Sequence, residues 1–537
     1  MAEAVAAALA KGQHLIAEAG TGVGKSFAYL VPAIQYVTAE PPQKSKKQRT
    51  DEEDGNESER RRVVISTHTI SLQEQLLHKD LPLLRSVMPD EFTAVLVKGR
   101  GNYLSLRRMN LAAERSVSLF SDSEELGELR QIIAWSKKTG DGSLSDLSFT
   151  PRRPVWDEVA SDSSNCLGRK CPTYGDCFYY RARRRIENAH LLIVNHALFC
   201  SDLALRRAGV SILPDYDAVI FDEAHTLEAV AGDHLGLSVT SGRVQYLLNK
   251  LYNDRTNKGL LVTRKLAKAQ DLAVDCHTRA DELFREAYEL VSQPGNRTGR
   301  VHEPHLLENR LSPALVQLAV LLKQEAKQID DESERLDFTS AHDRLVALAG
   351  ELTAWIEQKE AGAVYWIEKT ATRGRPRVSL SAAPIEVGPI LRAELFEKTR
   401  TAVLTSATLA VGQPPQFDFY KSRLGLTRCE TFRAGSPFNY REQAELILVR
   451  GLPDPTAAKE EFERRSIDMI KRYVERTGGH AFVLFTSYEA LRKAAAALTP
   501  WLASRNFALY SQADGTPRTQ MVEQFKKNPQ GVLLGTD

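Results

Sequence analysis

Two short segments, far apart in the chain, restrict the fold more than any other feature of the sequence. Residues 18–26 read Glu-Ala-Gly-Thr-Gly-Val-Gly-Lys-Ser, between a short apolar run and a helix predicted from Lys25 to Tyr36. Residues 219–225 read Val-Ile-Phe-Asp-Glu-Ala-His. A strand, a glycine-rich turn and a helix in this order are the setting that a phosphate-binding loop requires. Together the two segments predict an α/β protein that hydrolyses a nucleoside triphosphate.

The predicted phosphate-binding loop combines a flexible backbone with two useful side chains. Its glycines let the backbone approach phosphate oxygens, and the N-terminus of the following helix adds partial positive charge. We expect Lys25 to reach the β- and γ-phosphates and the Ser26 hydroxyl to ligate Mg²⁺. A glycine of the strict pattern is replaced by Ala19, but three glycines remain. The predicted ATP-binding residues are Ala19, Gly20, Thr21, Gly22, Val23, Gly24, Lys25 and Ser26.

Two adjacent carboxylates, Asp222 and Glu223, end an apolar run that predicts a buried strand. At the end of a strand in an α/β sheet they would lie in the crevice where ligands bind. We assign Asp222 to Mg²⁺ and Glu223 to polarising the attacking water, with Lys25 completing the catalytic set. His225 is expected to couple this site to a second lobe. Taken alone, Asp-Glu-Ala-His is also compatible with a solvated start of a helix, but a phosphate-binding loop in the same chain favours the catalytic interpretation.

The composition is that of an ordinary globular protein with several domains. The 537 residues are 42% hydrophobic and 26% charged, and the net charge is +2. Any affinity for nucleic acid must therefore come from local patches. The sequence predicts no transmembrane helix and no signal peptide, and six cysteines are too few for a disulfide framework. We expect a cytoplasmic protein without a membrane partner.

Hydrophobic patterns divide the chain into segments. The charged residues 40–62 predict a disordered insertion. Strands that alternate with helices predict a parallel sheet, with strands at 63–68, 92–97, 191–194 and 218–221. From about residue 237 to 360 the apolar spacing predicts a mostly helical domain. Further strands are predicted at 364–367, 378–380 and 402–409, and a second α/β unit has predicted strands at 444–449, 480–485, 507–509 and 532–534.

In their order along the chain, these segments resemble superfamily 2 DNA helicases of the DinG and XPD type. The similar segments are the phosphate-binding loop (motif I), 66–69 with 72–75 (motif Ia), 222–225 (the DEAH box, motif II), 405–409 (motif III) and 485–488 (motif IV). Two further segments, Val364-Tyr365-Trp366 and Ala382-Ala383-Pro384, resemble DinG proteins in particular. The resemblance covers essentially the whole chain.

The resemblance implies two RecA-like P-loop NTPase lobes, with an iron–sulfur-type insertion and a helical arch insertion in lobe one. The implied segments are lobe one at 1–98, the iron–sulfur-like insertion at 99–190, the DEAH part of lobe one at 191–236, the arch-like domain at 237–362, the last part of lobe one at 363–440 and an incomplete lobe two at 441–537. ATP is expected to bind between the lobes. The residues implied to couple nucleotide state to the grip on DNA are Thr405, Ser406, Ala407 and Thr408.

The implied activity is ATP-driven 5′→3′ translocation on single-stranded DNA, with unwinding of duplexes or R-loops in DNA repair. The implied partners are single-stranded and forked DNA and RNA–DNA hybrids, and we expect a monomer. Because the chain ends within what resembles motif V, we expect weak ATP hydrolysis from it alone. Two alternatives remain open: a catalytically incomplete fragment that binds ATP and DNA, and an RNA helicase.

Three cysteines, Cys166, Cys171 and Cys177, lie close together in a segment with glycine and proline. Soft thiolates favour iron–sulfur clusters or zinc. The resemblance implies a [4Fe–4S] cluster, but Ser105 stands at the position of the first ligand. Three outcomes stay open: a cluster completed by Ser105 or another group, a zinc or three-iron site, and a vestigial site.

Basic and aromatic residues surround this cysteine segment. Residues 178–185 read Phe-Tyr-Tyr-Arg-Ala-Arg-Arg-Arg; arginines can neutralise phosphates and aromatic rings can stack on bases. The alternative is a helix whose aromatic side chains pack inward while its arginines are solvated. A second basic group comprises Lys98, Arg100, Arg107 and Arg108. The predicted DNA-binding residues are Thr67, His68, Lys98, Arg100, Arg181 and Arg184.

Overall fold

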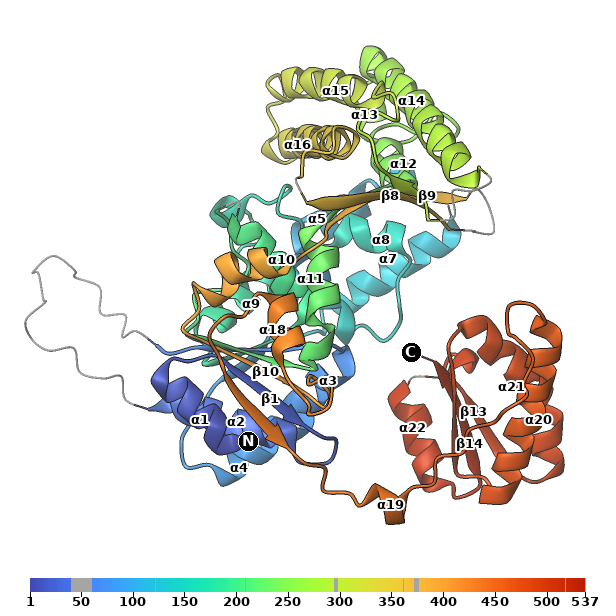
Figure 1. Ribbon diagram of the computed structural model, residues 1–537. Helices are drawn as coiled ribbons and strands as arrows, with labels where there is room; N and C mark the ends of the chain where they lie inside the picture. The colour runs from blue at the N-terminus through green and yellow to red at the C-terminus, as the bar shows by residue number, and fades with distance from the viewer. Residues whose placement is uncertain are drawn as a thin grey trace, which may run out of the picture. The chain divides into compact units, whose positions relative to one another are not determined.

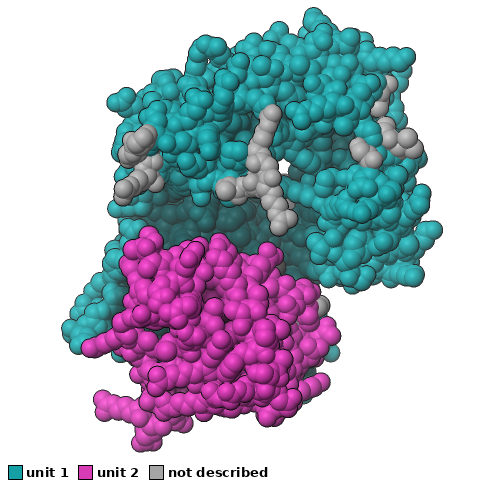
Figure 2. Space-filling model, turned by 90° about the vertical axis from the view of Figure 1, so that its right-hand side faces the viewer, with its two compact units in different colours: residues 1–437 teal, residues 438–537 magenta. Residues whose placement is uncertain are grey.

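The chain forms two compact units, residues 1–437 and 438–537 (Figure 2). The computed structural model describes residues 1–39, 60–120, 122–207, 209–293, 298–360, 362–370, 376–516 and 518–536. The predicted disordered insertion at 40–62 lies outside the described residues except for its last three positions. Among the helices that the structure describes, none has the length and apolar character needed to cross a membrane.

A seven-stranded parallel sheet forms the centre of the first unit (Figure 1). Its strands, in the order β11-β1-β10-β5-β2-β4-β3, are β11 (Glu430–Ala434), β1 (Leu15–Ala19), β10 (Thr401–Ser406), β5 (Ala218–Asp222), β2 (Val63–Thr67), β4 (Leu191–Asn195) and β3 (Ala94–Leu96). Most of these strands are buried along their length, which matches their near-continuous apolar sequence and is typical of a sheet covered on both faces. The α/β fold predicted from the sequence is confirmed.

Successive residues of each strand face two different hydrophobic cores. Ile16, Val64 and Val219 lie in one core, whereas Ala17 and Ile65 lie in the other. The helices packed around this sheet are α1 (Ala2–Lys11), α2 (Lys25–Thr38), α3 (Ile70–Gln75), α4 (Leu81–Val87), α10 (His196–Arg207), α11 (Leu227–Leu235), α17 (Gly388–Leu391) and α18 (Asp418–Leu424). This alternation determines to which face of the sheet each side chain points, including the side chains at the carboxyl ends of the strands.

The cysteine-containing insertion has a hydrophobic core of its own. It consists mainly of α5 (Leu106–Glu114), α6 (Ser116–Leu119), α7 (Ser123–Ser136), α8 (Arg153–Val159) and α9 (Phe178–Glu187). Tyr103, Trp156 and Phe178 are buried together in this core. The amphipathic character of α9 is therefore real: Phe178, Ala182 and Ile186 are buried on one side of the helix.

A helical domain with a small antiparallel sheet makes up the other insertion. Its helices are α12 (Ser241–Leu251), α13 (Leu260–Thr263), α14 (Ala267–Ser292), α15 (Leu311–Ala326) and α16 (Glu332–Ile356), and its sheet runs β6 (Leu237–Thr240), β9 (Arg377–Pro384), β8 (Ala363–Thr370) and β7 (Arg300–Val301). The predicted boundary at 362/363 is wrong. Tyr365, Ile367 and Leu380 share one core with the helices, so β8 and β9 belong to this domain and not to the last part of lobe one.

The second unit contains a three-stranded parallel sheet in the order β12-β14-β13. Its elements are α19 (Tyr440–Gln443), α20 (Lys459–Thr477), β12 (Ala481–Phe485), α21 (Tyr488–Ser504), β13 (Ala508–Ser511), α22 (Arg518–Lys527) and β14 (Gly531–Thr536). The strand predicted at 444–449 is wrong: Leu446 is 84% exposed, Leu448 is 73% exposed, and no described strand pairs with the segment. An apolar extended run becomes a strand only where a neighbouring strand accepts its backbone hydrogen bonds.

Candidate nucleotide site

The phosphate-binding loop lies between β1 and α2, as the sequence predicts. Gly22 has φ 83° and Gly24 has φ 76°, a left-handed backbone that side chains other than glycine rarely adopt. Gly24 is the N-cap of α2, and its carbonyl accepts the first helical hydrogen bond from Ala28 N. Lys25 and Ser26 therefore occupy the first turn of the helix, where backbone N–H groups favour an anion.

Asp222 ends β5 and is buried, with 4% of its surface exposed. The Tyr29 hydroxyl donates a hydrogen bond to Asp222 Oδ2 at 3.0 Å. Burial and the neighbouring charge of Glu223 raise the pKa of Asp222, whereas Lys25 and the Tyr29 hydroxyl act in the opposite direction. An ionised carboxylate in this position has the chemistry that Mg²⁺ prefers.

Glu223 links the phosphate-binding loop to the DEAH segment. Its Oε1 lies 3.3 Å from Lys25 Nζ, although the two residues are far apart in sequence. Glu223 has φ 54°, an uncommon backbone conformation for a residue other than glycine, and strain of this kind clusters at functional sites. The structure thus brings together the predicted catalytic residues Lys25, Asp222 and Glu223.

The segment that resembles motif III reaches the same carboxylate. Ser406 Oγ donates to Glu223 Oε2 at 3.2 Å and lies 2.8 Å from His225 Nδ1. Thr405 is the register partner of Asp222, and among the described residues its buried hydroxyl has no hydrogen-bond partner. Ala407 and Thr408 follow the end of β10. Ser406 is thus the predicted coupling residue that directly contacts the DEAH box.

Sequence reasoning missed three residues of this site: Tyr29, Glu18 and His196. Tyr29 lies one helical turn after Lys25 on α2, and this spacing could have indicated that it faces the sheet. His196 is 1% exposed, and its Nδ1 lies 2.7 Å from Ser66 Oγ. Burial lowers the pKa of His196 to about 4, so the imidazole is neutral near pH 7. Glu18 is held by partners that no sequence pattern indicates.

Among the predicted DNA-binding residues, the Lys98 and Arg100 side chains are already engaged within the protein. Thr67 is buried at the end of β2, whereas His68 is exposed beside it. Lys98 Nζ donates to Asp141 Oδ2 at 3.2 Å and to two serine hydroxyls at 2.7 Å. Arg100 donates to Ser161 Oγ at 3.1 Å and lies over the Tyr179 ring. Lys98 and Arg100 therefore stabilise the insertion itself.

Of the remaining members of the second basic group, Arg107 connects the insertion to the helical domain, and Arg108 binds within the insertion. Arg107 is 8% exposed and donates to Asn165 and to Ser333, which lies on α16. Arg108 donates to two backbone carbonyls of the insertion, at 2.6 and 2.7 Å. These contacts leave no exposed cationic surface at Arg107.

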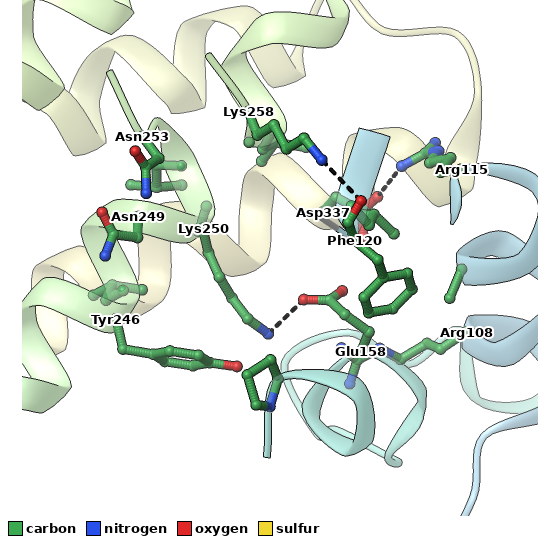
Figure 3. A pocket seen from close by; sticks show the side chains of 18 of the residues that line it. Arg108, Arg115, Phe120, Glu158, Tyr246, Asn249, Lys250, Asn253, Lys258 and Asp337 are labelled. Atoms are coloured by element: carbon green, nitrogen blue, oxygen red, sulfur yellow. Dashed lines mark hydrogen bonds and ion pairs between the residues drawn. The ribbon is translucent and has the colours of Figure 1, made fainter. Parts of the chain in front are cut away.

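A cavity of about 370 Å³ lies where these two domains meet (Figure 3). Lys250 points toward Glu158 at 2.9 Å, and Arg115 points toward Asp337 at 3.2 Å. These are charged pairs between the domains, and the cavity is lined by neither the phosphate-binding loop nor the DEAH segment. We therefore do not assign the nucleotide to it.

Arg181 and Arg184 differ from the other predicted DNA-binding cations. They line an open surface pocket of about 510 Å³ with Gly140, Arg185 and Asn188. Arg181 lies over the Phe178 ring at 4.8 Å, and Arg185 pairs with Asp141 at 3.0 Å. Within the part of the chain that the structure describes, no carboxylate pairs with Arg181 or Arg184. These two guanidinium groups are accessible to an anion.

Two of the three cysteines of the insertion, Cys166 and Cys171, contact separate groups. Cys166 Sγ accepts the N–H of Gly168 at 3.4 Å, and Cys171 Sγ lies 3.3 Å from the Thr173 hydroxyl. The Ser105 hydroxyl caps α5 by accepting the N–H of Arg108. Over the described ranges, no group of three or more His, Cys, Asp or Glu residues is arranged to hold a metal ion. The insertion offers three cysteine thiols, and the Ser105 hydroxyl at the expected fourth position is engaged as a helix cap, so the described residues do not present four ligands for a [4Fe–4S] cluster.

The fold and the site define a P-loop NTPase with a DEAH box. Comparison with known families agrees: residues 2–121 match a family described as DEAD/DEAH box helicase, residues 163–244 match DEAD_2, and residues 470–537 match a helicase C-terminal domain. The solved structure "XPD_Helicase" has a similar fold, with a TM-score of 0.51 and 14% identity over all of this chain and 78% of that one.

Curated relatives extend over the whole chain. The ATP-dependent DNA helicase YoaA of Escherichia coli is 30% identical over 547 residues, which cover all of this chain and 77% of the relative. The ATP-dependent helicase DinG of Mycobacterium tuberculosis is 29% identical, covering all of this chain and 77% of that protein. The protein named 3′–5′ exonuclease DinG of Bacillus subtilis is 26% identical, covering all of this chain and 59% of its own length. The chain belongs to the DinG and YoaA family of ATP-dependent DNA helicases, and its fold is XPD-like.

Proposed function

We propose that this protein uses ATP hydrolysis to move 5′→3′ on single-stranded DNA and to unwind duplexes or R-loops in DNA repair. The observation that carries the proposal is the convergence of Lys25, Glu223 and Ser406 beside Asp222 at one edge of the parallel sheet. Family membership supports DNA as the substrate. The direction of movement and the repair role rest on the resemblance to DinG and XPD helicases.

Each residue of the site has a defined part in the proposed reaction. The backbone of residues 19–24 cradles the phosphates, and Lys25 neutralises charge that develops on the transferred group. Ser26 and Asp222 would hold Mg²⁺, which supplies further charge neutralisation when bound. Glu223 orients the attacking water and accepts its proton. His225 is proposed to act together with Ser406 in coupling this site to the grip on DNA.

DNA binding is proposed to depend on cations that are not neutralised inside the protein. Arg181 and Arg184 meet this condition, and we propose that they contact the phosphate backbone without reading sequence. His68 and Thr67, at the end of β2, are proposed contacts on lobe one. Lys98 and Arg100 are proposed only as supports of the insertion, because their donors are already occupied. The iron–sulfur cluster is not part of this proposal, because the described residues do not present four ligands for it.

Strand-separation assays test the proposal. Partial DNA duplexes with either a 5′ or a 3′ single-stranded tail, R-loops, RNA–DNA hybrids and RNA duplexes are incubated with protein, ATP and Mg²⁺. Glu223→Gln serves as the hydrolysis-deficient control, and Glu351→Gln, in the helical domain, as a matched remote control. We expect unwinding of the 5′-tailed DNA by the parent and by Glu351→Gln, but not by Glu223→Gln.

Other outcomes identify the alternatives. Unwinding from the 3′ tail alone would contradict the proposed direction. Unwinding of RNA duplexes in preference to DNA would identify an RNA helicase. Binding of ATP and single-stranded DNA without turnover would identify an ATP- and DNA-binding module. Light scattering of the parent at the assay concentration checks the proposed monomer.

A further inference from the structure

Glu18 is the next-to-last residue of β1, just before the phosphate-binding loop, and makes three hydrogen bonds through its carboxylate. Oε2 accepts the backbone N–H groups of Leu409 and Ala410, each at 2.7 Å, and Oε1 accepts Arg433 Nε at 2.7 Å. The Glu18 side chain is 10% exposed. Burial alone would raise the pKa of Glu18, but the two amides and Arg433 outweigh burial and lower it. The group is therefore a buried carboxylate that stays ionised.

These contacts connect three strands of the sheet. Glu18 and Ser406 are register partners on the adjacent strands β1 and β10. The carboxylate then binds the chain just beyond Ser406, in the turn that leaves β10, while Arg433 belongs to β11. Without Glu18, the N–H of Leu409, which is 5% exposed, would lose its acceptor, and an unpaired buried amide is costly. The turn would have to move to recover a partner.

We propose that Glu18 is a positioning residue for ATP hydrolysis. By holding the turn after β10, it keeps Ser406 Oγ within hydrogen-bond distance of Glu223 Oε2. It also ties that turn to the residue that precedes Ala19 and the phosphate-binding loop. Glu18 does not touch the nucleotide in this arrangement, so its effect on the reaction passes through Ser406 and Glu223. The inference rests on the proposed ATP hydrolysis at this site.

The test compares the kcat and KM of DNA-stimulated ATP hydrolysis. Glu18→Ala removes all three hydrogen bonds. Because hydrogen bonds to a charged group stabilise a structure more than neutral ones, we expect kcat to fall by about ten- to a hundredfold. Glu18→Gln keeps one acceptor oxygen for the amides but loses the ionic contact with Arg433, so a smaller, few-fold fall is expected. Arg433→Gln is the matched partner variant and should resemble Glu18→Gln. In all three, the KM for ATP should stay within about twofold of the parent value.

A double-mutant cycle separates positioning from a general loss of structure. If Glu18 acts through Ser406, then Glu18→Ala combined with Ser406→Ala should lower kcat no further than Ser406→Ala alone, within about twofold. Fully additive losses, or a raised KM with kcat unchanged, would overturn the proposal. Thermal unfolding of Glu18→Gln identifies a folding defect, because this conservative variant keeps the shape of the side chain.

A second measurement keeps this inference distinct from the proposed function. If the parent does not hydrolyse ATP, the proposed function fails, and amide hydrogen exchange still tests the contact. Glu18→Ala should then speed exchange at Leu409 and Ala410 and also in the DEAH segment at Glu223, because Ser406 is released. Unchanged exchange at Glu223 would overturn the positioning role.

Discussion

The nucleotide site and the cysteine-containing insertion were both predicted from residue spacing, but only the first is assembled. At the nucleotide site, residues from α2, β10 and the end of β5 meet within hydrogen-bond distance, as Lys25 and Ser406 do with Glu223. In the insertion, Cys166 and Cys171 have separate partners and Ser105 caps a helix. Parallel strands fix where their last residues lie, whereas a loop places its side chains only through additional bonds. Spacing is therefore stronger evidence at the ends of strands than in loops.

Iron content gives the largest contrast between the two regions. Because the described residues do not present four ligands for a cluster, we expect protein purified anaerobically to contain well under four irons and four acid-labile sulfides per chain. Ser105→Cys supplies a fourth soft ligand and is the comparison variant. Four irons and four sulfides in the parent, with the matching visible absorption, would contradict the expected absence of a cluster. The insertion would then contain an assembled site, as the nucleotide region does.

The insertion should depend on its packing for stability. Gly142 has φ 64°, and a Cβ there would lie 2.1 Å from Phe178 Cγ. Gly142→Ala should therefore lower the free energy of unfolding of the insertion by about 2–4 kcal/mol, from the strained backbone and the overlap with the ring. Gly140→Ala is the matched control, since nothing lies within 4 Å of its Cβ. The protection of the α9 amides from hydrogen exchange is measured in both variants. Equal protection in the two would contradict the contact between Gly142 and Phe178.

The pH dependence of ATP hydrolysis should report the Tyr29–Asp222 hydrogen bond. The Tyr29 hydroxyl stabilises the charged carboxylate, so Tyr29→Phe should raise the pKa of Asp222 further. Mg²⁺ needs the ionised form, so activity falls as pH drops through this pKa. We expect the acid limb of the kcat/KM profile to move to higher pH. Tyr36→Phe, on the same helix, is the control, and coincident acid limbs in the two variants would refute the assignment.

The smallest expected effect concerns the arginines of α9. Replacing both Arg181 and Arg184 with alanine should weaken single-stranded DNA binding. The slope of log K against log salt should become shallower by about 0.7 for each phosphate that is no longer neutralised. Arg185→Ala is the matched control, because Asp141 already neutralises this neighbour. A slope that changes equally in the double variant and the control would remove α9 from the proposed DNA path.

The sequence was sufficient to predict strands and site residues where the local hydrophobic pattern and the geometry of a parallel sheet agree. Strands such as β2 and β5 could be predicted from their apolar runs, and the edge of the sheet then determined where Asp222 lies. The strands at β8 and β9 were also predicted, but their partners β6 and β7 were not, because pairing over long sequence distances leaves no local signal. The bonds of Glu18 could not be predicted either, since two of its partners are backbone amides near residue 410.

The most direct test of the account is ATP hydrolysis by the parent and by Lys25→Ala, with and without single-stranded DNA. We expect DNA to stimulate ATP hydrolysis by the parent, and Lys25→Ala to lose about two or more orders of magnitude in kcat. Single-stranded DNA binding should be nearly unchanged in the variant, because Lys25 lies at the phosphate-binding loop and not among the proposed DNA contacts. Equal rates of ATP hydrolysis in the two proteins would contradict the assignment of this edge of the sheet as the catalytic site.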